Sequence, residues 1–224
     1  MNGPQNMRED GQPAGGFMPK MSVPIQRLGW ENTTFEGVVR IGDERTRKSE
    51  IVEIYIDDQA ARGPLVSLMF RQPLSGTAGV AVVEECRFLY FGTDHRLDTA
   101  TPELPADHDW ERIVDPDPVT LFRFSAIRFN SHRIHSDRRY AVDVEGYPGL
   151  IVQGTLINFL MVEIARAGAA GETLRALDFL IHKPTFDTAP FTMRGATTGM
   201  RGTLRALDGD GVLSMTADAR YTAR

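Results

Sequence analysis

Two imidazoles and a carboxamide lie close together in the segment FNSHRIHSD, at His132, His135 and Asn130. Histidine is the side chain best suited to exchange a proton near neutral pH, whereas an amide can orient a water molecule but cannot act as a base. On spacing alone, such a histidine more often bonds a local carbonyl, and such an asparagine more often caps a helix. The segment is therefore a candidate site for proton transfer, and the alternative is that both side chains have only a local structural role.

A second feature lies downstream, where EGYPGLIVQGT leads into a strongly apolar segment at residues 153–167. Its apolar residues cover almost the whole helical circumference, which predicts a buried helix. The helix start lacks the usual Ser, Asp or Asn, and Gly154 lets another group approach the free N–H donors closely. Free donors at a buried helix start favour binding of an oxyanion.

The elements that must position these residues are mostly predicted strands. Residues 124–130 alternate and are rich in Phe and Ile, so the polar cluster is expected at a strand end, with helical turns at residues 136–144. Further strands are expected near residues 34–41, 45–56, 64–72, 79–91, 173–182, 191–198, 201–207 and 212–219. One apolar helix beside alternating strands predicts an α+β fold.

The segments FNSHRIHSD and EGYPGLIVQGTL resemble motifs of the MaoC-like hydratase/dehydratase family of the hotdog fold. Within it, the chain looks most like mesaconyl-CoA and itaconyl-CoA hydratases and the mitochondrial type 2 3-hydroxyacyl-thioester dehydratases. The wider MaoC motif begins with Asp and ends with His, and the corresponding ends here are Asn130 and His135. This branch of the family also has Asn there, so the departure supports the branch. The resemblance implies an antiparallel sheet wrapped around a buried central helix.

The resemblance extends over most of the chain, through FEGVVRIGDERTRKSEI and GVAVVEECRFLYF to LIHKPTFDTAPFTMRG and DGVLSMTADA. We therefore expect a double hotdog with an N-terminal half at residues 1–92, an acidic, proline-rich linker at 93–118 and a catalytic half at 119–224. Residues 1–24 contain no periodic apolar stretch long enough for a central helix. The N-terminal half is therefore expected to be degenerate or truncated.

The resemblance also implies roles for individual residues. His135 would exchange a proton with the substrate, Asn130 would orient a water, and the Gly154 N–H would receive the thioester oxygen. Candidate substrate-binding residues are His132, Arg133, Tyr147, Gly149, Val152 and Gln153. Three of these have competing interpretations, because His132 could brace the loop, Arg133 could belong to a solvated face and Gly149 could be an ordinary turn residue.

Composition narrows the function classes. A net charge of −5 without a basic stripe argues against a nucleic-acid partner. No apolar run reaches membrane-spanning length and no secretory signal is visible, so a cytoplasmic protein without a membrane partner is expected. The single cysteine, Cys86, cannot form an internal disulfide and fits a small buried hydrophobe. No phosphate-cradling loop or metal-ligand spacing is present, so neither a metal nor a redox cofactor is expected.

The leading functional hypothesis is reversible hydration of a 2-enoyl-CoA to a 3-hydroxyacyl-CoA, with the CoA thioester as substrate rather than cofactor. The resemblance suggests a branched dicarboxylic acyl group of four or five carbons, as in mesaconyl-CoA or itaconyl-CoA. Two alternatives stay open: an acyl-CoA thioesterase, for which Asp137 is the carboxylate nearest the motif, and a non-catalytic acyl-CoA-binding protein. A homodimer is also a possible state, since an incomplete half exposes surface that a second copy could cover.

Overall fold

The computed structural model of the chain describes residues 6–14, 17, 19, 21, 23, 25–60, 63–92, 108–168 and 171–223. Most of the expected linker, residues 93–107, therefore lies outside the described residues. The elements are β1 (Ile25–Phe35), β2 (Thr46–Arg47), β3 (Glu50–Asp57), β4 (Leu65–Gly76), β5 (Gly79–Phe91), β6 (Trp110–Val114), α1 (Pro118–Arg128), a 3₁₀ turn (Arg133–His135), a π-helical turn (Tyr140–Val144), α2 (Gly154–Ala167), β7 (Thr173–Ile181), β8 (Phe191–Thr198), β9 (Arg201–Leu207) and β10 (Leu213–Thr222).

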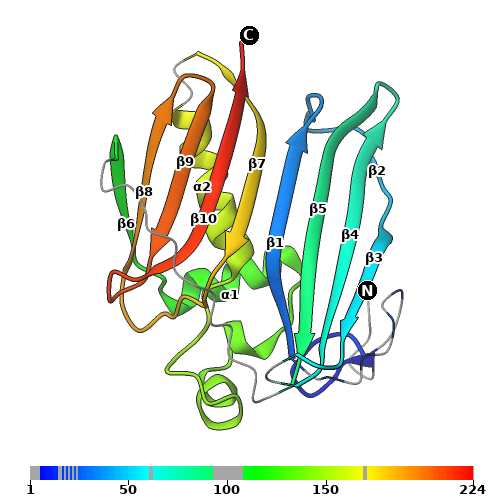
Figure 1. Ribbon diagram of the computed structural model, residues 1–224, viewed down its shortest axis with the longest axis vertical. Helices are drawn as coiled ribbons and strands as arrows, with labels where there is room; N and C mark the ends of the chain where they lie inside the picture. The colour runs from blue at the N-terminus through cyan, green and yellow to red at the C-terminus, as the bar shows by residue number, and fades with distance from the viewer. Residues whose placement is uncertain are drawn as a thin grey trace.

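All these strands join one antiparallel sheet in the order β2-β4-β5-β1-β7-β10-β9-β8-β6, with β3 paired to β4. Strands β1–β5 form the N-terminal half, and β6–β10 with α2 form the C-terminal half (Figure 1). The halves meet where β1 pairs with β7, with Trp30 opposite Leu180 and Thr34 opposite Ala176. This arrangement confirms the α+β prediction.

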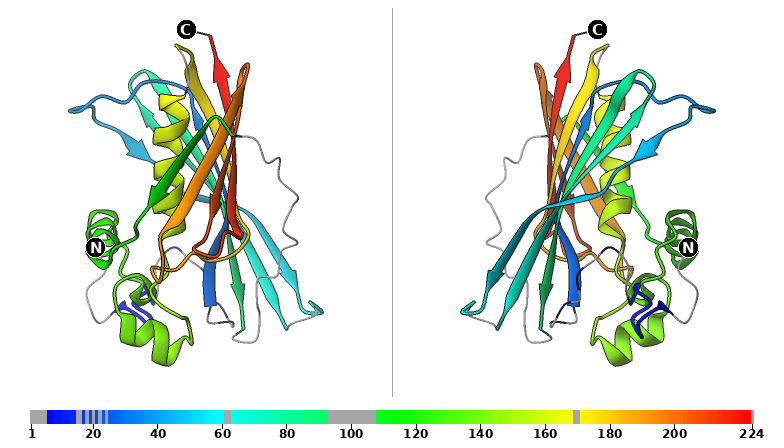
Figure 2. Two further views of the ribbon diagram at one scale, coloured as in Figure 1. Left: turned by 90° about the vertical axis from the view of Figure 1, so that its left-hand side faces the viewer. Right: turned by 90° about the vertical axis from the view of Figure 1, so that its right-hand side faces the viewer.

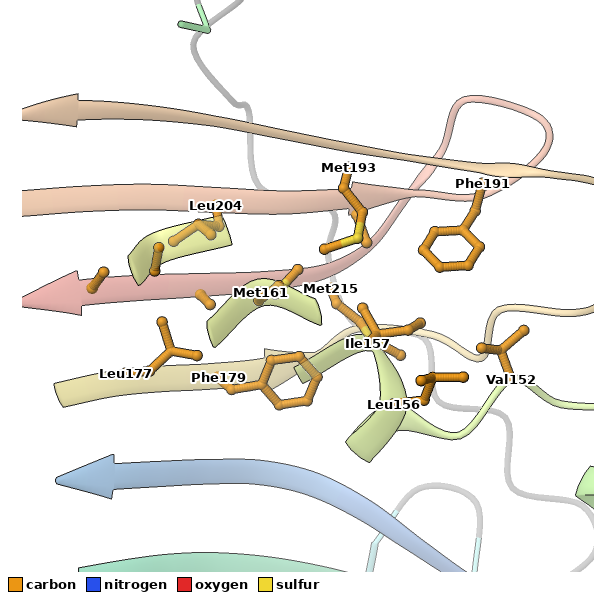
Figure 3. Packing of buried hydrophobic residues seen from close by; sticks show 14 of the residues in the cluster. Val152, Leu156, Ile157, Met161, Leu177, Phe179, Phe191, Met193, Leu204 and Met215 are labelled. Atoms are coloured by element: carbon orange, nitrogen blue, oxygen red, sulfur yellow. The ribbon is translucent and has the colours of Figure 1, made fainter. Parts of the chain in front are cut away.

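Helix α2 lies along one face of the sheet of the C-terminal half (Figure 2). Its Ile157 and Met161 are fully buried and point toward Phe179 and Met215 of the strands (Figure 3). The expectation that the helix is buried all round is wrong, because Phe159 on its outer side is 56% exposed. A helix that covers only one face of a sheet keeps one side toward solvent.

Helix α1 replaces the strand predicted at residues 124–130. The Asp117 side chain caps it by accepting hydrogen bonds from the Val119 and Thr120 N–H groups at 2.9 and 3.1 Å, and Pro118 occupies the first turn. The helix ends at Arg128, and the following residue, Phe129, has a left-handed φ of 51°. A strong helix start therefore outweighs the alternation of Phe and Ile, and the polar cluster follows a helix end.

The N-terminal half contains no helix within residues 25–60 and 63–92. The strand predicted at residues 34–41 is wrong over most of its length, since β1 runs from Ile25 to Phe35 and residues 36–41 belong to no strand. Part of the expected linker is also structured, since β6 pairs with β8 along Trp110–Val114. Burial raises the pKa of Cys86 to about 12, which fits the small buried hydrophobe expected from the sequence. In the described residues, no helix combines the length and apolar character needed to cross a bilayer.

Candidate active site

His135 ends the 3₁₀ turn that follows α1, and two hydrogen bonds tie this turn to the segment before α2. The His135 Nδ1 lies 2.7 Å from the Ile151 carbonyl, and the Ile151 N–H donates to the Ile134 carbonyl at 2.9 Å. Because a carbonyl only accepts, Nδ1 carries the proton and Nε2 keeps its lone pair. The turn thus fixes the tautomer of the ring.

Burial makes this histidine neutral. Only 8% of His135 is exposed, and desolvation lowers its pKa to about 4, with the Ile151 hydrogen bond opposing the shift and the charge of Arg27 adding to it. At pH 7 the ring is therefore uncharged, and its Nε2 can accept a proton.

Gly154 begins α2, and its N–H is available to a ligand. Gln153 precedes the helix without a capping side-chain bond, while the Leu156 and Ile157 N–H groups bond back to the Gln153 carbonyl. No acceptor in the described part of the chain pairs with the Gly154 N–H. Free N–H groups at a helix start favour negative charge.

Gln153 also fixes where α2 begins. Its side-chain amide donates to the Leu121 carbonyl at 2.9 Å and lies 2.8 Å from the Ser125 hydroxyl, both on α1. Gln153 is only 1% exposed, so these hydrogen bonds form away from water, where the low dielectric constant makes them stronger. Helix α1 therefore sets the position of the Gly154 N–H relative to the rest of the site.

A cavity of about 1150 Å³ lies between the two halves, and His135 and Gly154 both line it. Among the other predicted site residues, five also line this cavity: Asn130, His132, Tyr147, Val152 and Gln153. The N-terminal half supplies Arg27 and Glu31 of β1 to the same wall. The structure thus brings the proton-transfer candidate and the oxyanion candidate into one compartment.

Asn130 and His132 are both tied into the loop. The Asn130 Oδ1 accepts a hydrogen bond from the His132 N–H at 3.2 Å, which leaves the amide nitrogen as the part that could hold a water. His132 Nδ1 lies 3.1 Å from the Gln12 amide, and its ring meets the His135 ring edge to face at 5.5 Å. Burial lowers the pKa of His132 to about 2, with added effects of His135, Arg27 and Arg8. These contacts fit the bracing role.

Arg133 is not among the described residues that line the cavity. It lies over the Tyr140 ring at 4.2 Å, bonds Asp137 at 2.8 Å and donates to the Glu9 carbonyl at 3.1 Å. These contacts anchor the site loop to the N-terminal segment.

Gly149 also lies outside that set. A Cβ at this position would sit 2.7 Å from Asp187 Oδ1, which accepts a hydrogen bond from the Leu150 N–H at 2.8 Å. The geometry therefore gives Gly149 a structural reason to be glycine, the close approach of Asp187.

Two cavity residues had no signal in the sequence. Gln12 reaches His132 across 120 positions of the chain, and the neighbouring Gly11 carbonyl accepts a bond from the Ser131 hydroxyl at 2.6 Å. Arg27 donates to the Tyr147 hydroxyl and to the Gln26 carbonyl. Both lie in polar stretches without periodicity, so only the fold reveals them.

Glu31 is the third residue that the sequence did not single out. It is 7% exposed and accepts a hydrogen bond from the Asn158 amide of α2 at 2.5 Å. Burial raises its pKa to about 7 and the charge of Glu84 adds to the rise, while Arg128 opposes it. A carboxyl group whose protonated form is favoured by burial thus belongs to the cavity wall.

An antiparallel sheet packed on one long helix, with a neutral histidine and a free helix-start N–H in one cavity, is the arrangement expected of the hotdog class. The family model for hydroxyacyl-thioester dehydratase type 2 matches residues 2–187, and the chain belongs to this family. The predicted MaoC-like family and its hydratase/dehydratase, or hydro-lyase, activity are thereby confirmed. The roles of the individual site residues stay predictions.

Similar proteins agree with this assignment. A mesaconyl-C(4)-CoA hydratase of Chloroflexus aurantiacus is 35% identical over 214 residues, covering 94% of this chain and 76% of the relative. A mitochondrial hydroxyacyl-thioester dehydratase type 2 of Schizosaccharomyces pombe is 32% identical over 94 residues, which are 41% of this chain and 31% of that protein.

Solved structures show the fold. HtdX of Mycobacterium tuberculosis has a TM-score of 0.70 at 16% identity, covering 93% of this chain and 80% of its own. A MaoC-like dehydratase of Phytophthora capsici has a TM-score of 0.69 at 16% identity, covering 96% and 80%. The predicted hotdog fold is confirmed by these likenesses.

Proposed function

We propose that this protein hydrates a branched dicarboxylic 2-enoyl-CoA reversibly to its 3-hydroxyacyl-CoA, with His135 as the proton carrier. The observation that carries the proposal is the shared cavity of a neutral His135 and the free Gly154 N–H. Hydration of a double bond conjugated to a thioester requires two groups: a proton acceptor, and a hydrogen-bond donor that stabilises the oxyanion of the enolate.

The proposed chemistry uses one imidazole twice. His135 Nε2 removes a proton from water as the water oxygen bonds to Cβ of the enoyl group. The electron pair of the double bond moves through Cα to the thioester oxygen, and the Gly154 N–H stabilises the resulting enolate. The imidazolium then delivers the proton to Cα, so that one water has been added and the histidine is neutral again. One such oxyanion donor typically lowers the barrier by about 3 kcal/mol.

Asn130 completes the arrangement by holding the water through its amide nitrogen, because its oxygen is engaged by the His132 N–H. All these steps use groups of the chain itself. The expected lack of a metal or redox cofactor, the cytoplasmic location and the homodimer stay predictions.

The acyl group is proposed from the relatives. The protein that matches nearly the whole chain is named a mesaconyl-C(4)-CoA hydratase. We therefore expect mesaconyl-C4-CoA, or a similar branched dicarboxylic thioester, as the substrate.

A panel of enoyl-CoA thioesters with product detection tests the proposal. Loss of the enoyl absorbance with formation of a 3-hydroxyacyl-CoA is the expected result. Release of free CoA would instead favour the thioesterase, although its candidate carboxylate Asp137 is bonded to Arg133 and is not among the cavity-lining residues described. Binding of the thioesters without turnover across the panel would favour the alternative of a non-catalytic acyl-CoA-binding protein.

A further inference from the structure

Arg27 places a largely buried positive charge in the wall of the cavity. Its side chain is 13% exposed, and its guanidinium donates to the Tyr147 hydroxyl and, at 2.7 Å, to the Gln26 carbonyl. The group also lies over the Tyr147 ring at 5.4 Å and 3.5 Å from Glu145. These contacts hold the guanidinium in one place before any ligand arrives.

The charge of Arg27 reaches the reacting centre. It lowers the pKa of His135 and of His132, in each case after the larger effect of burial. In the described part of the chain, no carboxylate is among the groups that shift either pKa. Arg27, whose guanidinium pairs with Glu145 at 3.5 Å, therefore adds positive charge near both imidazoles, and an anionic ligand that binds there would be stabilised.

The chemistry of the proposed substrate says where such an anion would lie. In mesaconyl-C4-CoA the carbon that receives water also carries the free carboxylate. From standard bond lengths, the carboxylate oxygens lie only about 2.5 Å from that carbon. A group that binds this carboxylate must therefore stand beside the histidine that handles the water.

We propose that Arg27 binds a carboxylate on the β-carbon of the acyl group and thereby selects β-carboxy enoyl-CoA thioesters over uncharged ones. This inference rests on the proposed function. The planar guanidinium offers paired N–H donors that match a carboxylate, and Tyr147 orients it. The N-terminal half thus supplies specificity to a site whose reacting groups come from the C-terminal half.

The test compares mesaconyl-C4-CoA with 3-methylcrotonyl-CoA, which carries a methyl group in place of the carboxylate. Arg27→Gln is expected to lower the ratio of kcat/KM for the two substrates by about 100-fold, as for loss of one partner of a buried charge pair. Arg27→Lys, which keeps the charge but loses the planar fork, should give an intermediate ratio. An unchanged ratio in Arg27→Gln would overturn the inference.

Matched variants separate this role from general effects. Arg139, at 92% exposure and not among the cavity-lining residues, is the control, and Arg139→Gln should keep the wild-type ratio. Arg128→Gln removes another cavity cation, and an equal fall in the ratio there would contradict a specific role for Arg27. Because Arg27→Gln removes the ion-pair partner of the largely buried Glu145, the double variant with Glu145→Gln repeats the measurement without that charge.

A binding experiment distinguishes the failure of this inference from that of the proposed function. Titration calorimetry compares methylsuccinyl-C4-CoA with isovaleryl-CoA, which are the saturated counterparts of the two substrates. A preference for the acid that is lost in Arg27→Gln supports the inference even if no enoyl-CoA is hydrated. Hydration of both enoyl-CoA substrates with equal efficiency would keep the hydratase activity and overturn the role of Arg27.

Discussion

The inner faces of the two halves of the sheet differ in what covers them. In the C-terminal half, α2 packs Ile157 and Met161 against an apolar face. In the N-terminal half, β1 and β5 present Arg27, Glu31 and Glu84 to the cavity, and no helix lies within residues 25–60 and 63–92. Both halves bury apolar side chains, since Leu68 and Phe70 of β4 belong to a buried cluster of their own, but only the N-terminal half lines the cavity with these charged groups of its strands and so leaves room for a polar ligand.

The largest expected effect comes from the half that carries the reacting groups. His135→Gln should lower kcat by about 1000-fold, because the only proton carrier of the proposed mechanism is removed. The rate is measured from the loss of enoyl absorbance with mesaconyl-C4-CoA. His108→Gln is the control, since His108 is not among the described cavity residues. Equal rates in wild type and His135→Gln would end the proposed role.

Glu31, on the polar face of the N-terminal half, should make the free energy of unfolding depend on pH. The pKa of Glu31 is about 7 in the folded chain and near 4.5 when unfolded, so its stabilising contribution is present below pH 4.5 and lost as pH rises through 7. Glu31→Gln lacks this loss. From pH 5 to pH 8, its free energy of unfolding should therefore gain about 2 kcal/mol relative to wild type.

Urea unfolding at the two pH values provides that comparison. Glu163→Gln, an exposed change on α2, serves as the control and should follow the wild type. A constant difference between Glu31→Gln and wild type at both pH values would show that Glu31 is already ionised at pH 5.

A smaller effect is expected where α2 begins. The Cβ of Gly154→Ala would lie 2.7 Å from Ile181 Cδ1, so either the Ile181 side chain or the helix start must shift, and a shift of the helix start misplaces its N–H. We expect kcat/KM to fall about 10-fold. Adding Ile181→Val removes the clashing methyl and should restore the value of Ile181→Val alone. Gly168→Ala at the other end of α2 has only ordinary contacts and is the control, and no rescue in the double variant would refute this explanation.

The smallest effect concerns how α2 is attached to the C-terminal half. The Tyr221 hydroxyl donates to the Ala165 carbonyl at 3.0 Å in a buried position. Tyr221→Phe should lower the free energy of unfolding by about 1 kcal/mol. The exposed Tyr55 of β3 is the matched control in the other half, and Tyr55→Phe should change little. Equal losses in the free energy of unfolding for the two variants would show that the Tyr221 hydrogen bond does not stabilise the attachment of α2.

Sequence reasoning succeeded where one face of an element is apolar. The bounds predicted for β5, β8 and β9 match the structure, because alternation and turn residues mark both ends. Helix α2 was predicted from its apolar run, and its start at Gly154 fits the free donors expected there. His135 and Gly154 also share one cavity, as the predicted chemistry requires.

Prediction failed where the inner face is polar or where a local signal competes. The early part of β1 was missed because Arg27 and Glu31 face the cavity, so the strand lacks an apolar alternation. Helix α1 was predicted as a strand because its Phe and Ile residues alternate, although Asp117 and Pro118 mark a helix start. Contacts such as Gln12 with His132 join distant segments and leave no local pattern.

The most direct test of the central claim is hydration of mesaconyl-C4-CoA in D₂O, with the product analysed by NMR. If His135 alone takes the proton from water and returns it to Cα, the hydroxyl group and the deuterium must enter from the same face of the double bond. The account predicts this syn addition with deuterium at Cα. Anti addition would require a second proton carrier across the cavity and would contradict the single-histidine mechanism.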